Sequence, residues 1–536
     1  MADTLQHLLR ERAVQDTEAV RYGDRSWTWR EHLGAAAAQA AALIEAADPQ
    51  RPLHVGVLMG NTPDMLTALA AAGLGGYVLC GINTTRRGDG LARDIKRVDC
   101  QIVLTDAEHR HLIDDVDIDT DLPGVTVIDV STQAWADLVA AAPALVAHRE
   151  VGPDDTFMMI FTSGTSGEPK AVEVPHAMVL FAGSALVERY GLGGSDVCYL
   201  AMPLFHSNAV YAGWSVALGA GAAMAPAAFS ASRFLSDVRR YGATYMNYVG
   251  KPLAYILATP ERPDDADNTL RTAFGNEAAD RDIEEFGHRF GCTVWDGFGS
   301  TETAVIITRP DDCPTGSIGK GFPGVAIYDP ETVQECEIAR FDETGALVNA
   351  DAATGELVNT SGSGLFRGYY NDPGATDQRM RHGMYWSGDL AYRDADGWIY
   401  LAGRTADWMR IDGENLTTAP IERILLRLPA ISRVAVYPVP DEYVGDQVMA
   451  AIVLRDDVQL SPEQFAEFLA LQRDLSPKAW PRYVWIAADL PSTATNKILK
   501  RELIGLGTEP DGRVMWERDG LGFQAHGERA VSGTDR

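Results

Sequence analysis

Cysteine is scarce in this sequence, and basic residues are few beside acidic ones. The chain has 536 residues but six cysteines, with no Cys-x-x-Cys pair and no nearby cluster of histidines. This spacing disfavours a zinc site and predicts free thiols in a reducing compartment. The 46 lysines and arginines are outnumbered by 75 aspartates and glutamates, which gives a net charge of −29. Such an acidic chain is not expected to bind nucleic acid or to carry a polybasic membrane anchor.

Long uncharged runs are also rare. Met65–Thr85 and Ser207–Ser232 lack charge and are rich in alanine and glycine. Their length would fit a transmembrane helix, but their composition predicts buried helix–turn–strand units, with a true span as the open alternative. The N-terminus has no basic segment followed by an apolar one, so a secretory signal is not expected. We expect a cytoplasmic protein with no stable membrane span; a homodimer and peripheral contact with the inner face of the membrane are compatible with the sequence.

Helical and strand patterns alternate over the first 300 residues. Ala35–Ala47 favours a helix, and His54–Met59 and Ile102–Thr105 favour short strands. This alternation predicts an α/β fold of layered, mostly parallel sheets with helices. From about residue 317 to 403, short apolar segments alternate with Gly, Asp and Asn. They predict antiparallel hairpins and a β-barrel-like subdomain.

A small α+β domain is predicted after these hairpins. A helix over 419–428, strands near 434 and 450 and a helix over 462–473 alternate there. We predict a large N-terminal domain over 1–405, a small mobile C-terminal domain over 406–515, and a partly disordered polar tail over 516–536.

A loop rich in hydroxyl groups follows the apolar run that ends at Phe161. The segment Phe161–Lys170 (FTSGTSGEPK) combines four small hydroxyl residues, two glycines and a lysine. Backbone N–H groups, hydroxyls and an ammonium group of this kind can bind a polyphosphate. The lysine follows a proline, so the P-loop pattern is absent, and no Gly-x-Ser-x-Gly elbow occurs in the chain. Alone, the loop predicts either polyphosphate binding or a surface turn.

Further segments in a defined order restrict this choice. They are Asp296–Glu302 (DGFGSTE), Tyr385–Asp389 (YWSGD), the pair Gly403-Arg404, and Pro491–Leu503 (PSTATNKILKREL). With the loop, they resemble the adenylate-forming superfamily of acyl-CoA synthetases, adenylation domains and luciferases. Trp408–Leu416, with its Gly-Glu-Asn, and Phe274–Glu277 are similar to the fatty-acid-transport-protein-like and the actinobacterial fatty-acid and steroid-acid CoA ligases.

The resemblance implies a reaction in two halves, with ATP, Mg²⁺ and coenzyme A as cofactor and substrates. A carboxylate attacks the α-phosphorus of ATP, and a thiol then attacks the acyl carbon and expels AMP. The residues implied to hold the β- and γ-phosphates are Thr162, Ser163, Gly164, Thr165, Ser166, Gly167 and Lys170. Those implied to form the adenine pocket are Gly275, Asn276, Glu277 and Phe298.

The catalytic residues are implied in the same way. Thr301 would contact the α-phosphate, and Glu302, with Thr162, would hold Mg²⁺. Asp389 would accept hydrogen bonds from the ribose hydroxyls, with Arg404 as its cationic companion. Taken alone, each residue also has an ordinary structural explanation, such as a core ring, a solvated carboxylate or a turn aspartate.

Lys497 is implied to catalyse the first half-reaction, since a flexible ammonium group can follow negative charge as it moves. Its position before Ile498 could also be an ordinary basic helix start, and Asn496 stands where the superfamily often has glycine. In the superfamily the small domain rotates between the halves, here about a hinge just after Arg404, and replaces Lys497 with the segment around Gly413.

The acid is less defined by the sequence. Met202–His206 resembles a family segment beside the acyl pocket, and His206 is either close to the substrate carboxylate or a core histidine. The small residues of Ala209–Ala225 would leave room for a long or bulky apolar acid. We predict an ATP-dependent ligase that joins CoA to a long-chain fatty or steroid-side-chain acid. The rivals are a fatty-acyl-AMP ligase that loads a carrier protein, a fatty-acid uptake protein and a luciferase-like oxidoreductase.

Overall fold

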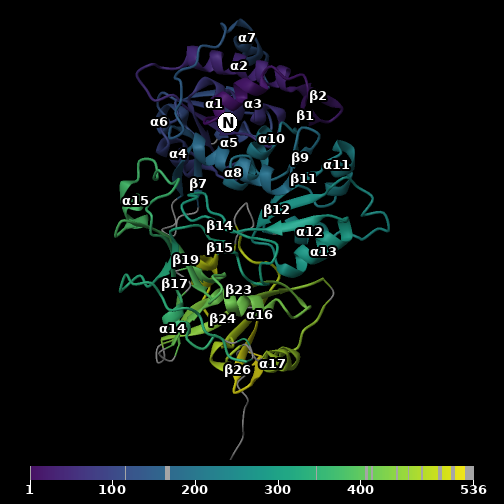
Figure 1. The fold of residues 1–536 in the computed structure, drawn as a ribbon, viewed down its shortest axis with the longest axis vertical. Coiled ribbons are helices and arrows are strands. Elements are labelled where there is room, and N and C mark those ends of the chain that lie inside the picture. The colour runs from purple at the N-terminus through teal and green to yellow at the C-terminus, as the bar shows by residue number, and fades with distance from the viewer. Residues whose placement is uncertain are drawn as a thin grey trace, which may run out of the picture. The chain divides into compact units, whose positions relative to one another are not determined.

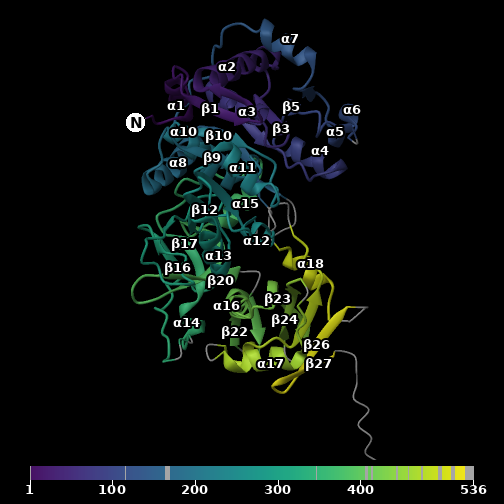
Figure 2. The same cartoon turned by 90° about the vertical axis from the view of Figure 1, so that its right-hand side faces the viewer.

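The structure is a computed structural model, and it describes residues 2–114, 116–162, 169–250, 252–343, 345, 347–404, 408–411, 414–441, 445–456, 458–472, 475–492, 498–508 and 513–525. The chain divides into two compact units (Figures 1 and 2). Unit 1 comprises Met1–Ala304 and Ser363–Met380, and unit 2 comprises Val305–Gly362 and Arg381–Arg536.

Unit 1 contains a six-stranded sheet built from the first half of the unit. Its order is β6 (Thr126–Asp129), β5 (Ile102–Thr105), β3 (His54–Leu58), β4 (Val78–Gly81), β7 (Thr156–Thr162) and β8 (Lys170–Pro175). All neighbours are parallel except β7 and β8. Strands β3, β4 and β5 are buried along their whole length, as apolar parallel strands covered on both faces should be. The strands expected near residues 54 and 102 are thus confirmed.

A second, seven-stranded sheet follows in the same unit. Its order is β13 (Thr293–Asp296), β12 (Thr272–Asn276), β11 (Tyr245–Val249), β9 (Val197–Leu200), β10 (Ala223–Pro226), β1 (Glu18–Tyr22) and β2 (Arg25–Thr28). Only the β1–β2 hairpin is antiparallel. After β9 the chain moves to β10 on one side, whereas after β11 it moves to β12 on the other. The sheet therefore has a topological switch point between β9 and β11, where open α/β sheets bind their ligands.

The helices of unit 1 begin and end where their sequences provide caps. In α2 (Trp29–Ala46), Thr28 and Glu31 form a capping box, and α3 (Pro63–Gly75) begins at a proline and ends before Gly76 in the left-handed conformation. Helices α2 and α3 lie side by side (Figures 1 and 2). The remaining helices of eight or more residues are α1 (Leu5–Arg12), α4 (Gly88–Arg97), α7 (Gln133–Ala141), α8 (His176–Tyr190), α11 (Phe234–Tyr241) and α13 (Asp280–Phe290). Short helices of this unit include α5 (His111–Asp114), α6 (Ile118–Asp121), α12 (Pro252–Leu257) and α15 (Pro373–Arg379).

Both uncharged segments are buried helix–turn–strand units, as predicted. The first is α3 followed by β4. The second runs through α9 (Ser207–Ala209), a π-helical turn over Val210–Trp214, α10 (Ser215–Ala220) and β10. Across the described ranges, no helix is long and apolar enough to cross a membrane.

Unit 2 begins with the predicted hairpins. A five-stranded sheet has the order β16 (Val325–Tyr328), β17 (Gly355–Asn359), β19 (Met384–Arg393) and β18 (Met380–Arg381), with β20 (Ile399–Arg404) also paired to β19. The β16–β17, β17–β19 and β19–β20 pairs are antiparallel. A short ladder joins β14 (Ile307–Thr308) to β15 (Lys320–Gly321), and α14 spans Ala350–Ala353.

The rest of unit 2 is the expected α+β arrangement. Its sheet has the order β22 (Glu414–Thr417), β21 (Trp408–Ile411), β24 (Gly445–Leu454), β25 (Tyr483–Ala487), β26 (Val514–Asp519) and β27 (Gly522–Ala525), and β23 (Ile431–Asp441) pairs with β24. Helix α16 (Thr418–Leu425) ends three residues before the predicted Leu428, because Pro429 disfavours helical backbone before it. Helix α17 (Pro462–Leu471) packs on β27 through Phe465 (Figure 2), and α18 spans Lys500–Gly505.

Candidate active site

The predicted site residues of unit 1 collect at the carboxyl ends of parallel strands. Asn276 ends β12 and Asp296 ends β13, next to it in the sheet. The segment Met202–His206 follows β9, on the other side of β11. In a parallel sheet these ends share one edge, so the adenine-pocket segment, the Phe298 segment and the His206 segment lie along one rim at the switch point.

The backbone of the predicted adenine pocket is packed closely. A Cβ on Gly275 would lie 2.3 Å from the carbonyl oxygen of Tyr248, so only glycine fits this position in β12. Glu277 has a φ of 65°, which is uncommon for a residue with a side chain and turns the chain sharply after the strand. The Gly297 N–H donates to the Gly275 carbonyl at 2.8 Å. Phe298, one residue further on, is half-buried at the same rim.

Thr301 and Glu302 are held by residues that the sequence interpretation did not identify. The hydroxyls of Thr301 and Ser207 are hydrogen-bonded at 2.9 Å, and the Tyr211 hydroxyl donates to the Thr301 carbonyl at 3.0 Å. Tyr369 donates its hydroxyl hydrogen to Glu302 Oε1 at 2.7 Å. Burial, together with the charge of Glu302, raises the pKa of Tyr369, so the phenol remains a donor at neutral pH. Tyr369 lies in Gly368-Tyr-Tyr-Asn-Asp372, and this polar run before a helix was the available signal.

Lys170 lies in the same polar cluster. Its Nζ is 5.2 Å from the centroid of the Tyr369 ring, a cation–π distance. The pKa of Lys170 is lowered, first by burial and then by the nearby Arg379. Asp372 and Glu302 act in the opposite direction and offset only part of this shift. Thr162 is paired with Lys170 in the β7–β8 register, so the predicted phosphate loop joins two antiparallel strands. The predicted loop residues Ser163–Gly167 lie outside the described residues.

His206 is neutral at physiological pH. Burial lowers its pKa to about 4, and its Nε2 atom is buried with no hydrogen-bond partner among the residues that the structure describes. Its ring lies 4.6 Å from that of Phe205. A neutral imidazole with an unused nitrogen can hydrogen-bond a ligand, but it cannot form an ion pair with a carboxylate.

The ribose residues predicted in unit 2 share a β-ladder. Asp389 in β19 is directly opposite Arg404 in β20, and Asp389 is buried. The Asp389 N–H donates to Ser387 Oγ at 3.0 Å. The side chain of Arg404, together with Gly413 and Lys497, lies outside the part of the chain that the structure describes.

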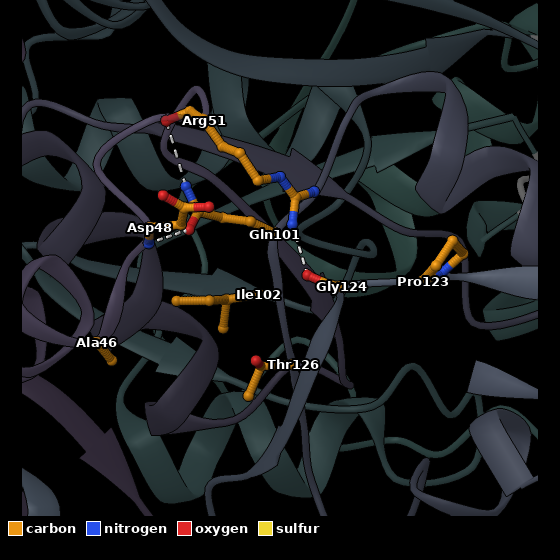
Figure 3. Close-up of a pocket in the computed structure, with 8 residues that line it drawn as sticks. All are labelled: Ala46, Asp48, Arg51, Gln101, Ile102, Pro123, Gly124 and Thr126. Atoms are coloured by element: carbon orange, nitrogen blue, oxygen red, sulfur yellow. Dashed lines mark hydrogen bonds between the residues drawn. The ribbon is translucent and has the colours of Figure 1, made fainter. Parts of the chain in front are cut away.

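A pocket of about 450 Å³ lies in unit 1 at the amino ends of strands β5 and β6 of the six-stranded sheet (Figure 3). Ile102 and Thr126, the first residues of β5 and β6, line it. Its polar groups bond to one another: Gln101 accepts from the Asp48 N–H at 2.8 Å, and the Arg51 guanidinium donates to the carbonyl oxygens of Gly124 and Cys100. Of the predicted site residues that the structure describes, none lines this pocket.

The residues present fit a magnesium ion that takes most of its ligands from ATP. No group of three or more His, Cys, Asp or Glu side chains within the described ranges could hold a metal ion. Mg²⁺ is commonly held by one or two carboxylates together with substrate phosphates and water. Glu302 Oε1 already accepts from Tyr369, which fixes the orientation of the carboxylate without replacing its charge.

The comparisons with known proteins identify the family of this chain. The AMP-binding enzyme family matches residues 9–370, and the AMP-binding enzyme C-terminal domain matches residues 420–497. This chain therefore belongs to the AMP-binding enzyme family.

Among its relatives is a medium/long-chain-fatty-acid–CoA ligase of Mycobacterium marinum, 52% identical over 96% of this chain and 99% of the relative. A steroid-22-oyl-CoA synthetase of Rhodococcus jostii is 43% identical over 93% and 90%. ATP-bound MatB from Rhodopseudomonas palustris has a TM-score of 0.82 at 24% identity, covering 94% of this chain and 99% of MatB, which confirms the fold. The prediction of an adenylate-forming acid–CoA ligase that uses ATP is thereby confirmed.

Proposed function

We propose that this ligase activates a medium- or long-chain fatty acid, first as acyl-AMP and then as acyl-CoA. The observation that carries the proposal is the 52% identity to a medium/long-chain-fatty-acid–CoA ligase across nearly the whole of both chains. The uncharged segment that follows His206, buried from Ala209 to Leu218, supports it, because an apolar acid needs apolar surroundings. A steroid-side-chain acid is the second candidate, supported by the 43% identity to the steroid-22-oyl-CoA synthetase.

In this proposal the first half-reaction depends on the cluster at the rim of unit 1. Lys170 and the loop after Thr162 bind the β- and γ-phosphates and hold the leaving pyrophosphate. Thr301, its hydroxyl held by Ser207, contacts the α-phosphate. Glu302, oriented by Tyr369, holds Mg²⁺, which offsets negative charge on the phosphate oxygens. The carboxylate of the acid and the phosphates of ATP are both anions. Charge neutralisation and alignment therefore account for most of the rate enhancement.

The remaining roles belong to unit 2. Asp389 and Arg404 bind the ribose, and Lys497 stabilises the charge that moves between the carboxylate and the α-phosphate. Rotation of residues 406–515 after adenylation then removes Lys497 and brings in the segment around Gly413 for attack by the CoA thiol. His206 supplies a neutral hydrogen bond near the acid.

The direct test is a coupled assay with Mg²⁺, ATP, CoA and acids of increasing chain length, including a steroid-22-oic acid. We expect AMP and acyl-CoA to form together, with kcat/KM highest for a medium- or long-chain fatty acid. A matched reaction with a carrier protein in place of CoA tests the acceptor. AMP release without any gain of CoA thioester would contradict the proposed acceptor, and a maximum at the steroid acid would contradict the proposed acid.

Two finer properties belong to the same proposal: a homodimer and peripheral contact with the inner face of the membrane. Sedimentation with anionic vesicles tests the second. An uptake protein would instead move fatty acid across a vesicle bilayer in the absence of ATP and CoA, and no thioester would form.

A further inference from the structure

The segment that carries Tyr369 adds a short strand to the edge of the six-stranded sheet, beside β8. The Tyr370 N–H donates to the Ala171 carbonyl at 2.8 Å. The Glu173 N–H donates to the Gly368 carbonyl at 3.1 Å. These two hydrogen bonds lie on either side of Tyr369, which forms an antiparallel bridge with β8. In this pattern the N–H of the middle residue points away from the neighbouring strand, so the Tyr369 N–H needs an acceptor elsewhere.

Helix α15 supplies that acceptor. The Tyr369 N–H donates to Thr376 Oγ1 at 3.0 Å, and Thr376 Oγ1 donates its own hydrogen to the Asp372 carbonyl at 3.1 Å. The start of the helix is fixed by Pro373 in its first turn and by the Asp372 side chain, which accepts from the Ala375 N–H at 3.0 Å. The Thr376 hydroxyl therefore joins a capped helix to the main chain of Tyr369.

The last residue of α15 contacts the other end of Tyr369. Arg379 Nε donates to the Tyr369 hydroxyl oxygen at 3.4 Å, and that hydroxyl donates to Glu302 Oε1 at 2.7 Å. A guanidinium group has no acceptor, so the hydroxyl hydrogen cannot face Arg379 and is left for Glu302. Helix α15 thus holds the main chain of Tyr369 and also sets the direction of its hydroxyl.

The position of Tyr369 matters because the groups that it contacts are shielded from solvent. Tyr369 is 5% exposed and Glu302 is 8% exposed. A buried carboxylate that loses a donor turns toward another donor or toward water, because an unpaired charge is unfavourable there. The ring of Tyr369 also lies 5.2 Å from Lys170 Nζ. One side chain therefore contacts two of the predicted site residues.

We propose that Thr376 and Arg379 are positioning residues for the first half-reaction, which hold Tyr369 so that its hydroxyl fixes the orientation of the Glu302 carboxylate. The proposal rests on the proposed function, which assigns Glu302 to Mg²⁺. Both residues act through Tyr369. A displaced Tyr369 then weakens the part of ATP binding that depends on the metal.

The main test is Thr376→Val, which keeps the shape of the side chain but removes the acceptor for the Tyr369 N–H. We expect the affinity for ATP with Mg²⁺, measured by titration calorimetry without acid or CoA, to fall about 10-fold, as is usual when a residue that orients a metal ligand is lost. The affinity for ATP with EDTA should fall much less. Thr376→Ser keeps the hydroxyl and should bind ATP with Mg²⁺ like the wild type.

A double-mutant cycle tests whether Thr376 acts through Tyr369. In the Tyr369→Phe background the hydroxyl is already absent, so Thr376→Val should lower the affinity little further. Losses that add up in the double variant would overturn the proposal, as would equal losses with Mg²⁺ and with EDTA. Arg379→Met removes the donor to the hydroxyl and should act in the same direction by a smaller factor, because its hydrogen bond is long. It serves if Thr376→Val does not fold.

The matched control is Thr67→Val. Thr67 Oγ1 donates to the Pro63 carbonyl at 2.9 Å within α3, just as Thr376 Oγ1 donates to the Asp372 carbonyl. The control therefore loses the same kind of bond in a different helix of unit 1. Its affinity for ATP should match that of the wild type with Mg²⁺ and with EDTA.

Hydrogen exchange adds a readout that needs no ligand. The Tyr369 amide should exchange faster in Thr376→Val than in the wild type, and at the wild-type rate in Thr67→Val. An unchanged rate in Thr376→Val would contradict the role of α15. Because calorimetry and exchange both omit the acid and CoA, a negative ligase assay would refute the proposed function without affecting either readout.

Discussion

At the scale of single residues, the structure gives Glu302 a partner that explains its orientation. A buried carboxylate needs a donor or a cation, and the Tyr369 hydroxyl supplies the donor at 2.7 Å. Glu302 was predicted as a site residue because it lies within the motif Asp296–Glu302. Tyr369 was not, because 67 residues separate it from Glu302 and no local pattern connects them.

Lys497 carries the sharpest residue-scale prediction. In Lys497→Ala, formation of acyl-AMP should fall about 100- to 1,000-fold, because one preorganised cationic donor is lost where charge develops. Thioester formation from synthetic acyl-AMP and CoA should stay close to wild type. Pyrophosphate release and thioester formation are measured separately. The control is Arg501→Ala, an exposed cation four residues further on. Normal adenylation by Lys497→Ala would refute the assignment.

At the scale of secondary-structure elements, two glycines in unit 1 should respond in opposite ways to an added methyl group. Gly34 lies within α2 with open space around its Cβ position, whereas Gly275 lies in β12 against the Tyr248 carbonyl. Gly34→Ala should stabilise the protein by about 0.5–1 kcal/mol, because alanine loses less backbone entropy in a helix.

Gly275→Ala should instead destabilise it by about 1–3 kcal/mol, the usual cost of forcing atoms into a packed interior. The β11–β12 pair must move apart to admit the methyl group, and we expect weaker ATP binding as well. Urea unfolding of both variants measures the two effects. Equal changes of the same sign would contradict this account of the strand packing.

The pattern of residues along the chain was sufficient to predict some secondary-structure elements, but it was not sufficient to predict how distant strands pair. The strands at 54–58 and 102–105 were predictable from short apolar runs, and helix α2 from its alanine-rich composition. The assignment of β1 and β2 to the seven-stranded sheet was not, because β1 pairs with β10, about 200 residues later in the chain. Such a long-range pair leaves no periodic signal in the sequence.

At the scale of the whole molecule, buried histidines should make stability depend on pH. His32 and His176 are 4% and 1% exposed, and burial lowers the pKa of each from 6.5 to about 4. Between these values the unfolded chain binds protons that the folded protein does not. The contribution of the two neutral histidines to the free energy of unfolding is therefore fully present above about pH 6.5. It is lost as the pH falls towards 4, by up to about 1.4 kcal/mol per pH unit for each histidine.

Urea unfolding at pH 7.5, 6.0 and 5.0 measures this dependence. His32→Gln, which cannot take up the proton, should lose less stability on acidification than the wild type, whatever its stability at pH 7.5. His111→Gln, at an exposed position on α5, is the control and should follow the wild type. Parallel pH curves for His32→Gln and wild type would contradict the prediction.

The residue types in the sequence motifs were sufficient to predict the class of enzyme, because the loop, the motifs and the lysine limit what a site can bind. The phosphate loop, Glu302 and the Asp389–Arg404 pair were all predicted from motifs and their order, and their roles stay predictions. The hydrogen bonds from Asn208 to Asn276 and from Tyr369 to Glu302 depend on tertiary structure, because the two partners of each bond lie far apart in sequence. A hydrogen bond needs its two atoms within about 3 Å. Only the folded chain brings those atoms together.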